Sequence, residues 1–141
     1  MKKGRLYAIL FVYEELVFFM ERKEMLSMVR KPILQIREGL GNGKGPAEVY
    51  HIVPKEDLYG HGRMYAKIVL PAGSYVGWHQ HVGETEPYFI LEGEGIFTDN
   101  DGSKTNVFPG DVCTILPGQW HSLDNASDSE PLVFMALIHN D

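Results

Sequence analysis

The stretch GSYVGWHQHVGETEPYFILEG, at residues 73–93, decides how this chain is interpreted. His79 and His81 stand two positions apart within it, so on an extended strand both imidazoles point to the same face. Gly83 lets the chain turn after them, and Glu86 then starts a new strand that can bring its carboxylate back toward the imidazoles. The stretch therefore predicts two strands that present three metal-binding side chains to one another.

A second stretch, GDVCTILPGQWHSLDN at residues 110–125, adds a third imidazole. Three imidazoles and one carboxylate form a nitrogen and oxygen donor set that suits a first-row divalent metal. One pair of histidines on a strand would not indicate a metal site, because such pairs are usually surface or packing residues. Here all four donors occur together with glycines that turn the chain between them, and the predicted metal ligands are His79, His81, Glu86 and His121.

The two stretches resemble the paired motifs of the cupin superfamily. The first motif is Gly, five residues, His-x-His, three or four residues, Glu, six residues and Gly, and residues 73–93 match it at every position. The second motif departs at its proline position, which Leu116 holds, and matches at Gly110, Gly118, His121 and Asn125. The resemblance covers roughly residues 64–139. It implies an all-β fold, the double-stranded β-helix or jelly-roll barrel, with a metal inside.

The rest of the chain agrees with an all-β domain. Short runs rich in Val, Ile, Tyr and Phe recur from Val49 onward, separated by turn signals such as NDDG and LPG. That pattern favours a sandwich or barrel. Residues 31–141 are therefore expected to form a single cupin β-barrel domain, in which the glycine-rich residues 38–48 form a loop. Turns where a Cβ would clash are expected at the motif glycines, Gly73, Gly93, Gly110 and Gly118.

Residues 1–30 form an N-terminal extension of different character. A basic start precedes the apolar run at residues 6–13, but Glu14 and Glu15 interrupt it and no small-x-small cleavage site follows. We therefore expect neither a signal peptide nor a membrane span in the extension. We expect a helix whose apolar stripe packs on the barrel or on a partner subunit. The alternative is an artefact of start-site choice, since later starts are offered by Met20, Met25 and Met28.

Composition narrows the classes of partner. The net charge of −6 is uneven, with +3 on residues 1–31 and −9 on residues 32–141, so the barrel would repel a phosphate backbone. The single cysteine, Cys113, excludes an internal disulfide and fits a reducing compartment. We therefore expect a cytoplasmic protein with no nucleic-acid or membrane partner. Cupins of this size commonly pair as homodimers, and exposed edge strands give a physical reason for pairing.

The predicted donor set also limits the cofactor. Four protein ligands leave about two positions of a six-coordinate ion for water, substrate or dioxygen. Open positions suit Mn(II), Fe(II) or Ni(II) better than a closed structural zinc site, although zinc acquired during purification also fits. One divalent transition-metal ion is therefore the expected cofactor. It could polarise a chelating carboxylate, diol or enediol, or activate dioxygen if it is redox-active.

Three other residues are candidates for a catalytic role. Tyr88 shares the face of Glu86 by alternation and is expected to line the cavity. Tyr65 and Lys67 lie on one face of the predicted strand at residues 63–70. They could orient an anionic substrate if that face points inward. If the opposite face points inward, they are surface residues.

The chain is similar to small cupins of the oxalate-decarboxylase type. Those proteins place an arginine three residues before His-x-His, where it grips the substrate carboxylate; here that position is Val76, which argues against oxalate and favours an aromatic or short organic ligand. The expected function is a metal-dependent enzyme that acts on a small organic molecule, an oxygenase, decarboxylase or isomerase. The alternatives are a non-catalytic module that binds a metal or small ligand, and a structural or interaction role for the extension. A general acid or base near the metal would favour the first, and a wholly apolar cavity the second.

Overall fold

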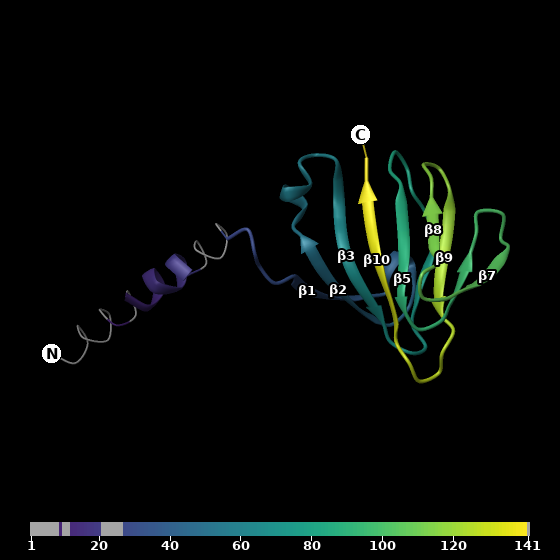
Figure 1. The fold of residues 1–141 in the computed structure, drawn as a ribbon, viewed down its shortest axis with the longest axis horizontal. Coiled ribbons are helices and arrows are strands. Elements are labelled where there is room, and N and C mark those ends of the chain that lie inside the picture. Colours follow the sequence, from purple (N-terminus) through teal and green to yellow (C-terminus); the bar gives the residue numbers. More distant parts are fainter. Residues whose placement is uncertain (1–8, 10–11, 21–26, 141) are drawn as a thin grey trace. The chain divides into compact units, whose positions relative to one another are not determined.

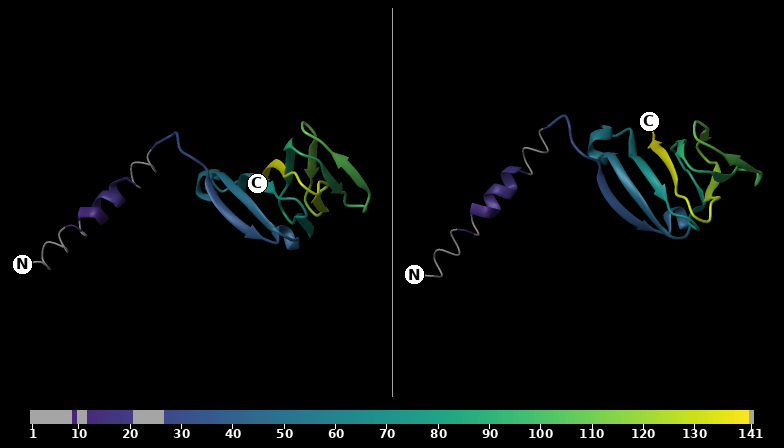
Figure 2. Two further views of the ribbon diagram at one scale, coloured as in Figure 1. Left: turned by 90° about the horizontal axis from the view of Figure 1, so that it is seen from below. Right: turned by 60° about the horizontal axis from the view of Figure 1, so that its bottom comes forward.

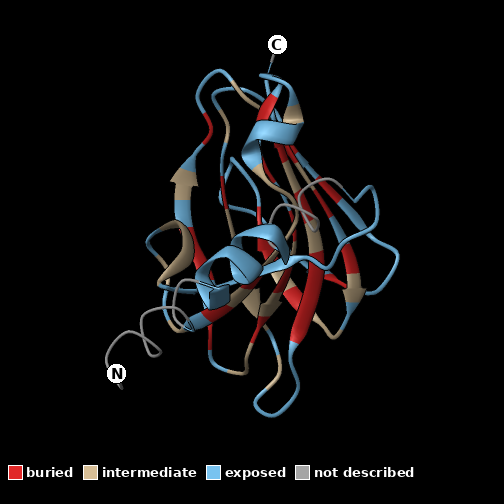
Figure 3. Cartoon of the chain, turned by 90° about the vertical axis from the view of Figure 1, so that its left-hand side faces the viewer, coloured by how far each residue is buried: buried red, intermediate tan, exposed pale blue. Residues whose placement is uncertain are grey.

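The computed structural model describes residue 9, residues 12–20 and residues 27–140. Contacts divide the chain into two compact units, Met1–Lys31 and Pro32–Asp141 (Figure 1). In the first unit residues 12–20 form the helix that the apolar pattern predicted, and Figure 3 shows it exposed along its length. Most of the apolar run at residues 6–13 lies outside the described residues, and so does Met25, one of the possible later start sites. Among those that are described, no helix is long and apolar enough to cross a membrane.

The second unit is built almost wholly from β-strands. Its described residues form ten strands and two short 3-10 helices: β1 Ile33–Glu38, η1 Leu40–Asn42, β2 Pro46–Val53, η2 Lys55–Leu58, β3 Gly62–Leu70, β4 Tyr75–Gln80, β5 Glu86–Glu92, β6 Gly95–Thr98, β7 Lys104–Val107, β8 Val112–Ile115, β9 Trp120–Asn125 and β10 Leu132–His139. Figure 2 shows these strands from two further sides.

The strands form two antiparallel sheets. One has the order β1-β2-β3-β10-β5-β8 and the other the order β4-β9-β6-β7. Strands β4 and β5 follow one another in the chain but lie in different sheets, so the turn between them carries the chain from one sheet to the other. This exchange between two packed sheets is typical of a jelly roll, and the predicted all-β barrel is confirmed.

The core lies between the two sheets, as Figure 3 shows by its buried strand segments. In β3 the side chains of Met64, Ala66, Ile68 and Leu70 are buried, while the intervening residues are more exposed. Period-2 alternation therefore turns the apolar face of β3 inward. The other sheet contributes Val76 from β4. Each large apolar side chain buried in this way stabilises the fold by about 1.5–3 kcal/mol.

The glycine-rich segment at residues 38–48 is more ordered than the predicted loop. It contains η1, and β2 begins at Pro46. The turn η1 packs closely against β4. A Cβ added to Gly77 would collide with the backbone of Asn42. The motif glycines also differ from expectation. All four adopt positive φ, but a Cβ would collide, with Pro131, only at Gly93, and it would meet open space at the other three: Gly73, Gly110 and Gly118.

Candidate metal centre and its cavity

The structure brings the four predicted ligands together from both sheets. His79 lies in β4, directly opposite His121 of β9, and His81 follows the end of β4. Glu86 is the first residue of β5, in the other sheet. One ligand atom from each of the four side chains lies within 4.8 Å of all the others. His79 is half-buried and the other three are buried, so the cluster is largely shielded from solvent.

The imidazole nitrogens converge on one point. Nε2 of His81 lies 3.1 Å from Nε2 of His79 and 3.2 Å from Nε2 of His121. Oε2 of Glu86 lies 2.8 Å from the His81 Nε2 and 3.2 Å from the His121 Nε2. Three nitrogens and one carboxylate oxygen thus face a common centre. This is the arrangement that a single coordinated ion requires.

Hydrogen bonds on the far side of two imidazoles orient their lone pairs. Nδ1 of His79 donates to the backbone oxygen of Gly77 at 2.8 Å, and Nδ1 of His81 donates to Oε1 of Glu84 at 2.9 Å. In a neutral imidazole the other nitrogen then carries the lone pair, so both Nε2 atoms face the centre as metal ligands.

These donor atoms fit a divalent cation. Two neutral Nε2 atoms supply no proton to Glu86, and its buried Oε2 has no hydrogen-bond donor among the described residues. An ion at the centre would satisfy this oxygen and the two oriented lone pairs at once. The residues present therefore could hold a metal.

The charges of the cluster favour a cation. Burial raises the pKa of the Glu86 carboxyl, but His121 and His81 outweigh this effect and hold the pKa at about 2. Burial lowers the pKa of His79. At His81 burial also acts to lower the pKa, but Glu86 and Glu84 together outweigh it and raise the pKa. Glu86 is thus ionised at neutral pH and gives the centre a permanent negative charge.

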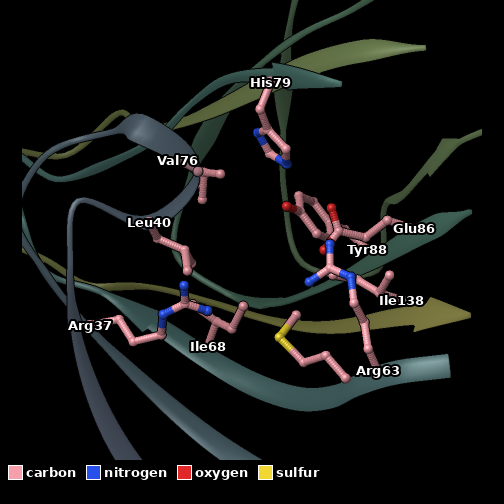
Figure 4. A pocket seen from close by; sticks show the side chains of 11 residues that line it. Arg37, Leu40, Arg63, Ile68, Val76, His79, Glu86, Tyr88 and Ile138 are labelled. Carbon is pink, nitrogen blue, oxygen red and sulfur yellow. The ribbon is translucent and has the colours of Figure 1, made fainter. Parts of the chain in front are cut away.

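A cavity of about 170 Å³ opens beside the cluster (Figure 4). His79, Glu86 and Tyr88 border it on one side, and the side chains of Arg37 and Arg63 point toward it. Its remaining wall consists largely of aliphatic side chains: Leu40, Met64, Ile68, Val76 and Ile138. The space next to the candidate metal position is therefore small, with two positive charges at its boundary.

The three catalytic candidates have different positions. Tyr88 lines the cavity and is fully buried, and burial followed by the charge of Glu86 raises its pKa well above the usual value, so its hydroxyl stays protonated. Tyr65 and Lys67 do not reach the cluster, because the opposite face of β3 is the buried one. Nζ of Lys67 instead lies 4.6 Å from the centre of the Tyr50 ring.

Three charged residues at the site were not predicted from the sequence. Arg63 donates from Nε and Nη2 to Glu84 at 2.9 and 2.7 Å, and Arg37 reaches the cavity from β1. Glu84 stands between His81 and Glu86 in the first motif, which was a usable signal. Neither arginine lies near a motif, so no local pattern could have indicated its role.

Comparisons with known proteins agree with this geometry. The family model described as Cupin domain matches residues 66–138. An "Oxalate-binding protein" of Thermotoga maritima is 44% identical over 96 residues, which span 68% of this chain and 78% of that protein. The crystal structure of a "predicted oxalate decarboxylase" from Thermotoga maritima aligns with a TM-score of 0.74 at 38% identity, over 82% of this chain and 100% of that one. A "cupin-like protein" from the same organism aligns with a TM-score of 0.61 at 21% identity, over 81% and 80% of the two chains, and so shows the fold alone.

Proposed function

The chain belongs to the cupin family, and from this premise we propose that it binds a small dicarboxylate of the oxalate type through one divalent metal ion. The ion would be held by His79, His81, Glu86 and His121. The relative that is 44% identical is an oxalate-binding protein, which supports this class of ligand.

The observation that carries the proposal is the pair of arginines at the cavity. The guanidinium of arginine matches a carboxylate with two parallel hydrogen bonds. Arg37 and Arg63 replace, from distant strands, the arginine that is missing at Val76, and so they remove the argument against oxalate. A cavity of about 170 Å³ is well below the roughly 300–1,000 Å³ of sites for drug-sized ligands, which favours a ligand of a few heavy atoms.

The metal and the protein would have separate tasks. A divalent ion supplies a Lewis acid with about two open positions, which suits a chelating dicarboxylate. Mn(II), Fe(II) and Ni(II) fit these donors best, and zinc is also compatible. The protonated hydroxyl of Tyr88 can donate a hydrogen bond at the cavity wall, and the arginines offset the negative charge of the ligand.

The cavity favours binding over turnover. Among its described lining residues, His79 and Glu86 are candidate ligands, and Tyr88 holds its proton. The arginines stay charged, so none of these side chains is poised to exchange protons near pH 7. Decarboxylation of the same ligand is the alternative function, supported by the solved structure that is called a predicted oxalate decarboxylase.

Calorimetric titration of oxalate into the manganese-loaded full chain tests the proposal. We expect binding that the metal-free chain lacks. Arg37→Gln or Arg63→Gln should weaken it about 10–100-fold, because each removes charged hydrogen bonds to a carboxylate. Lys67→Gln, on the outer face of β3, is the matched control and should bind like the parent. Equal binding of acetate and oxalate, or none, would contradict the proposal. Release of formate and carbon dioxide would identify the chain as an enzyme.

The homodimer and the cytoplasmic location are also proposals. Strand β1 lies at the edge of its sheet with all six residues exposed, among them Ile33, Leu34 and Ile36. An exposed edge of this kind is a physical reason for two copies to pair. Sedimentation equilibrium of the full chain should give twice the monomer mass of 16.0 kDa.

A further inference from the structure

Glu84 contacts both the candidate metal centre and one of the arginines. It lies in the turn between β4 and β5, and its side chain is mostly buried, with 17% exposed. A single oxygen, Oε1, accepts hydrogen bonds from Nδ1 of His81 at 2.9 Å and from Nη2 of Arg63 at 2.7 Å. The other oxygen accepts one from Nε of Arg63 at 2.9 Å. One carboxylate thus contacts both a predicted metal ligand and an arginine that borders the cavity.

We propose that Glu84 is a positioning residue that links the affinity for the metal to the affinity for the dicarboxylate. The inference rests on the proposed function, since it needs both a metal and an anionic ligand at this site. Glu84 itself would touch neither of them. It would act through His81 on the metal and through Arg63 on the ligand.

The contact with His81 controls the metal side. A hydrogen-bonded carboxylate holds the imidazole in one tautomer and one orientation and makes Nε2 a better donor. The His81 ring is buried, and its hydrogen bond to Glu84 therefore lies in a region where electrostatic contacts are strong.

The contact with Arg63 controls the ligand side. The fork to Glu84 uses two of the five N–H groups of the guanidinium, so the others can face a bound carboxylate. Arg63 borders both the inner cavity and an outer depression of about 600 Å³, which Glu84 and Glu56 also line. The Arg63–Glu84 pair therefore stands between this depression and the candidate metal centre. Without Glu84 the half-exposed guanidinium could turn out toward solvent.

Measurements on Glu84→Gln and Glu84→Ala test the two contacts separately. Manganese affinity is measured by the electron paramagnetic resonance signal of free Mn(II), and oxalate affinity by calorimetry at saturating manganese. We expect manganese affinity to fall about 10–100-fold in Glu84→Ala and less in Glu84→Gln, whose amide oxygen still accepts from His81. Oxalate affinity should fall about 10-fold in both variants, because neither keeps the charged fork. Glu56→Gln, in the same depression, is the matched control and should match the parent.

A double variant separates positioning from a purely structural role. If Glu84 acts on the ligand through Arg63, Glu84→Gln should add no loss of oxalate affinity to Arg63→Gln. Full additivity would overturn the proposal. So would parental affinities for both manganese and oxalate in Glu84→Gln and Glu84→Ala, or a change confined to the melting temperature of the metal-free protein. If the parent binds manganese but no oxalate, the proposed function is wrong, and so is the proposed link between metal affinity and oxalate affinity. The effect of Glu84 on manganese affinity is still measured in that case.

Discussion

The candidate metal centre gathers polar groups that the protein alone satisfies only in part. Oε2 of Glu86 and Nδ1 of His121 are both buried, and neither has a hydrogen-bond partner among the described residues. A buried polar group without a partner costs about 1–3 kcal/mol. At the scale of single residues, the cluster is therefore a locally unfavourable arrangement that a bound cation would relieve, at least at Glu86.

Removing one imidazole should abolish tight metal binding. For His121→Ala we expect manganese affinity to fall by at least about 100-fold, more than the 10–100-fold typical of residues behind the ligands. Elemental analysis of the purified full chain, with equilibrium dialysis against manganese, measures this change. His61→Ala removes an exposed histidine and is the control. Unchanged metal content in His121→Ala would show that the ion lies elsewhere.

Cys113 should be chemically inert in the folded protein. Burial raises the pKa of its thiol to about 11, with a further contribution from the charges of Asp111 and Asp99. At pH 7.5 fewer than about one thiol in a thousand is then ionised, and the thiolate is the reactive form. We expect no labelling by iodoacetamide at pH 7.5 and complete labelling in urea, both read by mass spectrometry. Rapid labelling of the native chain would contradict the burial of this side chain.

At the scale of elements, the contact between η1 and β4 places one side of the site. Gly77 lies within β4 where η1 packs against the strand, and its backbone oxygen accepts the hydrogen bond from His79. Leu40 and Gly41 of η1 also line the cavity. A residue without a side chain therefore serves both the packing of η1 and the orientation of a predicted metal ligand.

Gly77→Ala should disturb both of these functions. Its Cβ would collide with the backbone of Asn42, and overpacking of this kind typically costs about 1–3 kcal/mol. We expect a lower midpoint of urea unfolding and weaker manganese binding, because His79 loses its aligned acceptor. Gly110→Ala is the comparison, since its Cβ would meet open space and only the positive φ is unfavourable. That variant should lose stability without losing metal affinity.

How much could be predicted from the sequence depends on the range of the interactions. The His-x-His spacing and the turn to Glu86 are local, so they indicated side chains that the structure does bring together. Asn125, which matches the second motif, donates from Nδ2 to the carbonyls of Leu70 and Glu130. Such contacts follow from a motif of fixed geometry.

The unpredicted part of the site depends on long-range pairing. Arg63 and Lys67 stand on the same strand, and the sequence alone left open which face of β3 points inward. Arg63 reaches the cavity because it lies near the start of β3, close to Glu84 of the β4–β5 turn. Arg37 reaches it only through the pairing of β1 with β2. Neither relation leaves a periodic or spacing signal.

At the scale of the whole molecule, a bound ion should raise thermal stability. An ion that binds only the folded chain contributes about 4 kcal/mol when its concentration is 1,000 times its dissociation constant. For a domain of this size that corresponds to a rise of roughly 15 °C in melting temperature. Differential scanning calorimetry with manganese, and then with excess EDTA, should show the rise and its reversal. The same scans on His121→Ala should show neither.

The two sheets meet at the candidate metal centre, and this has a consequence for the lifetime of the fold. The histidines belong to the β4–β9 side, whereas Glu86 belongs to the opposite sheet. An ion bound to all four side chains would cross-link the two sheets. They could not separate until a coordination bond broke, so the ion would slow the opening of the barrel more than it would speed its closing. The durability of the folded state would then be set by how quickly the ion is exchanged.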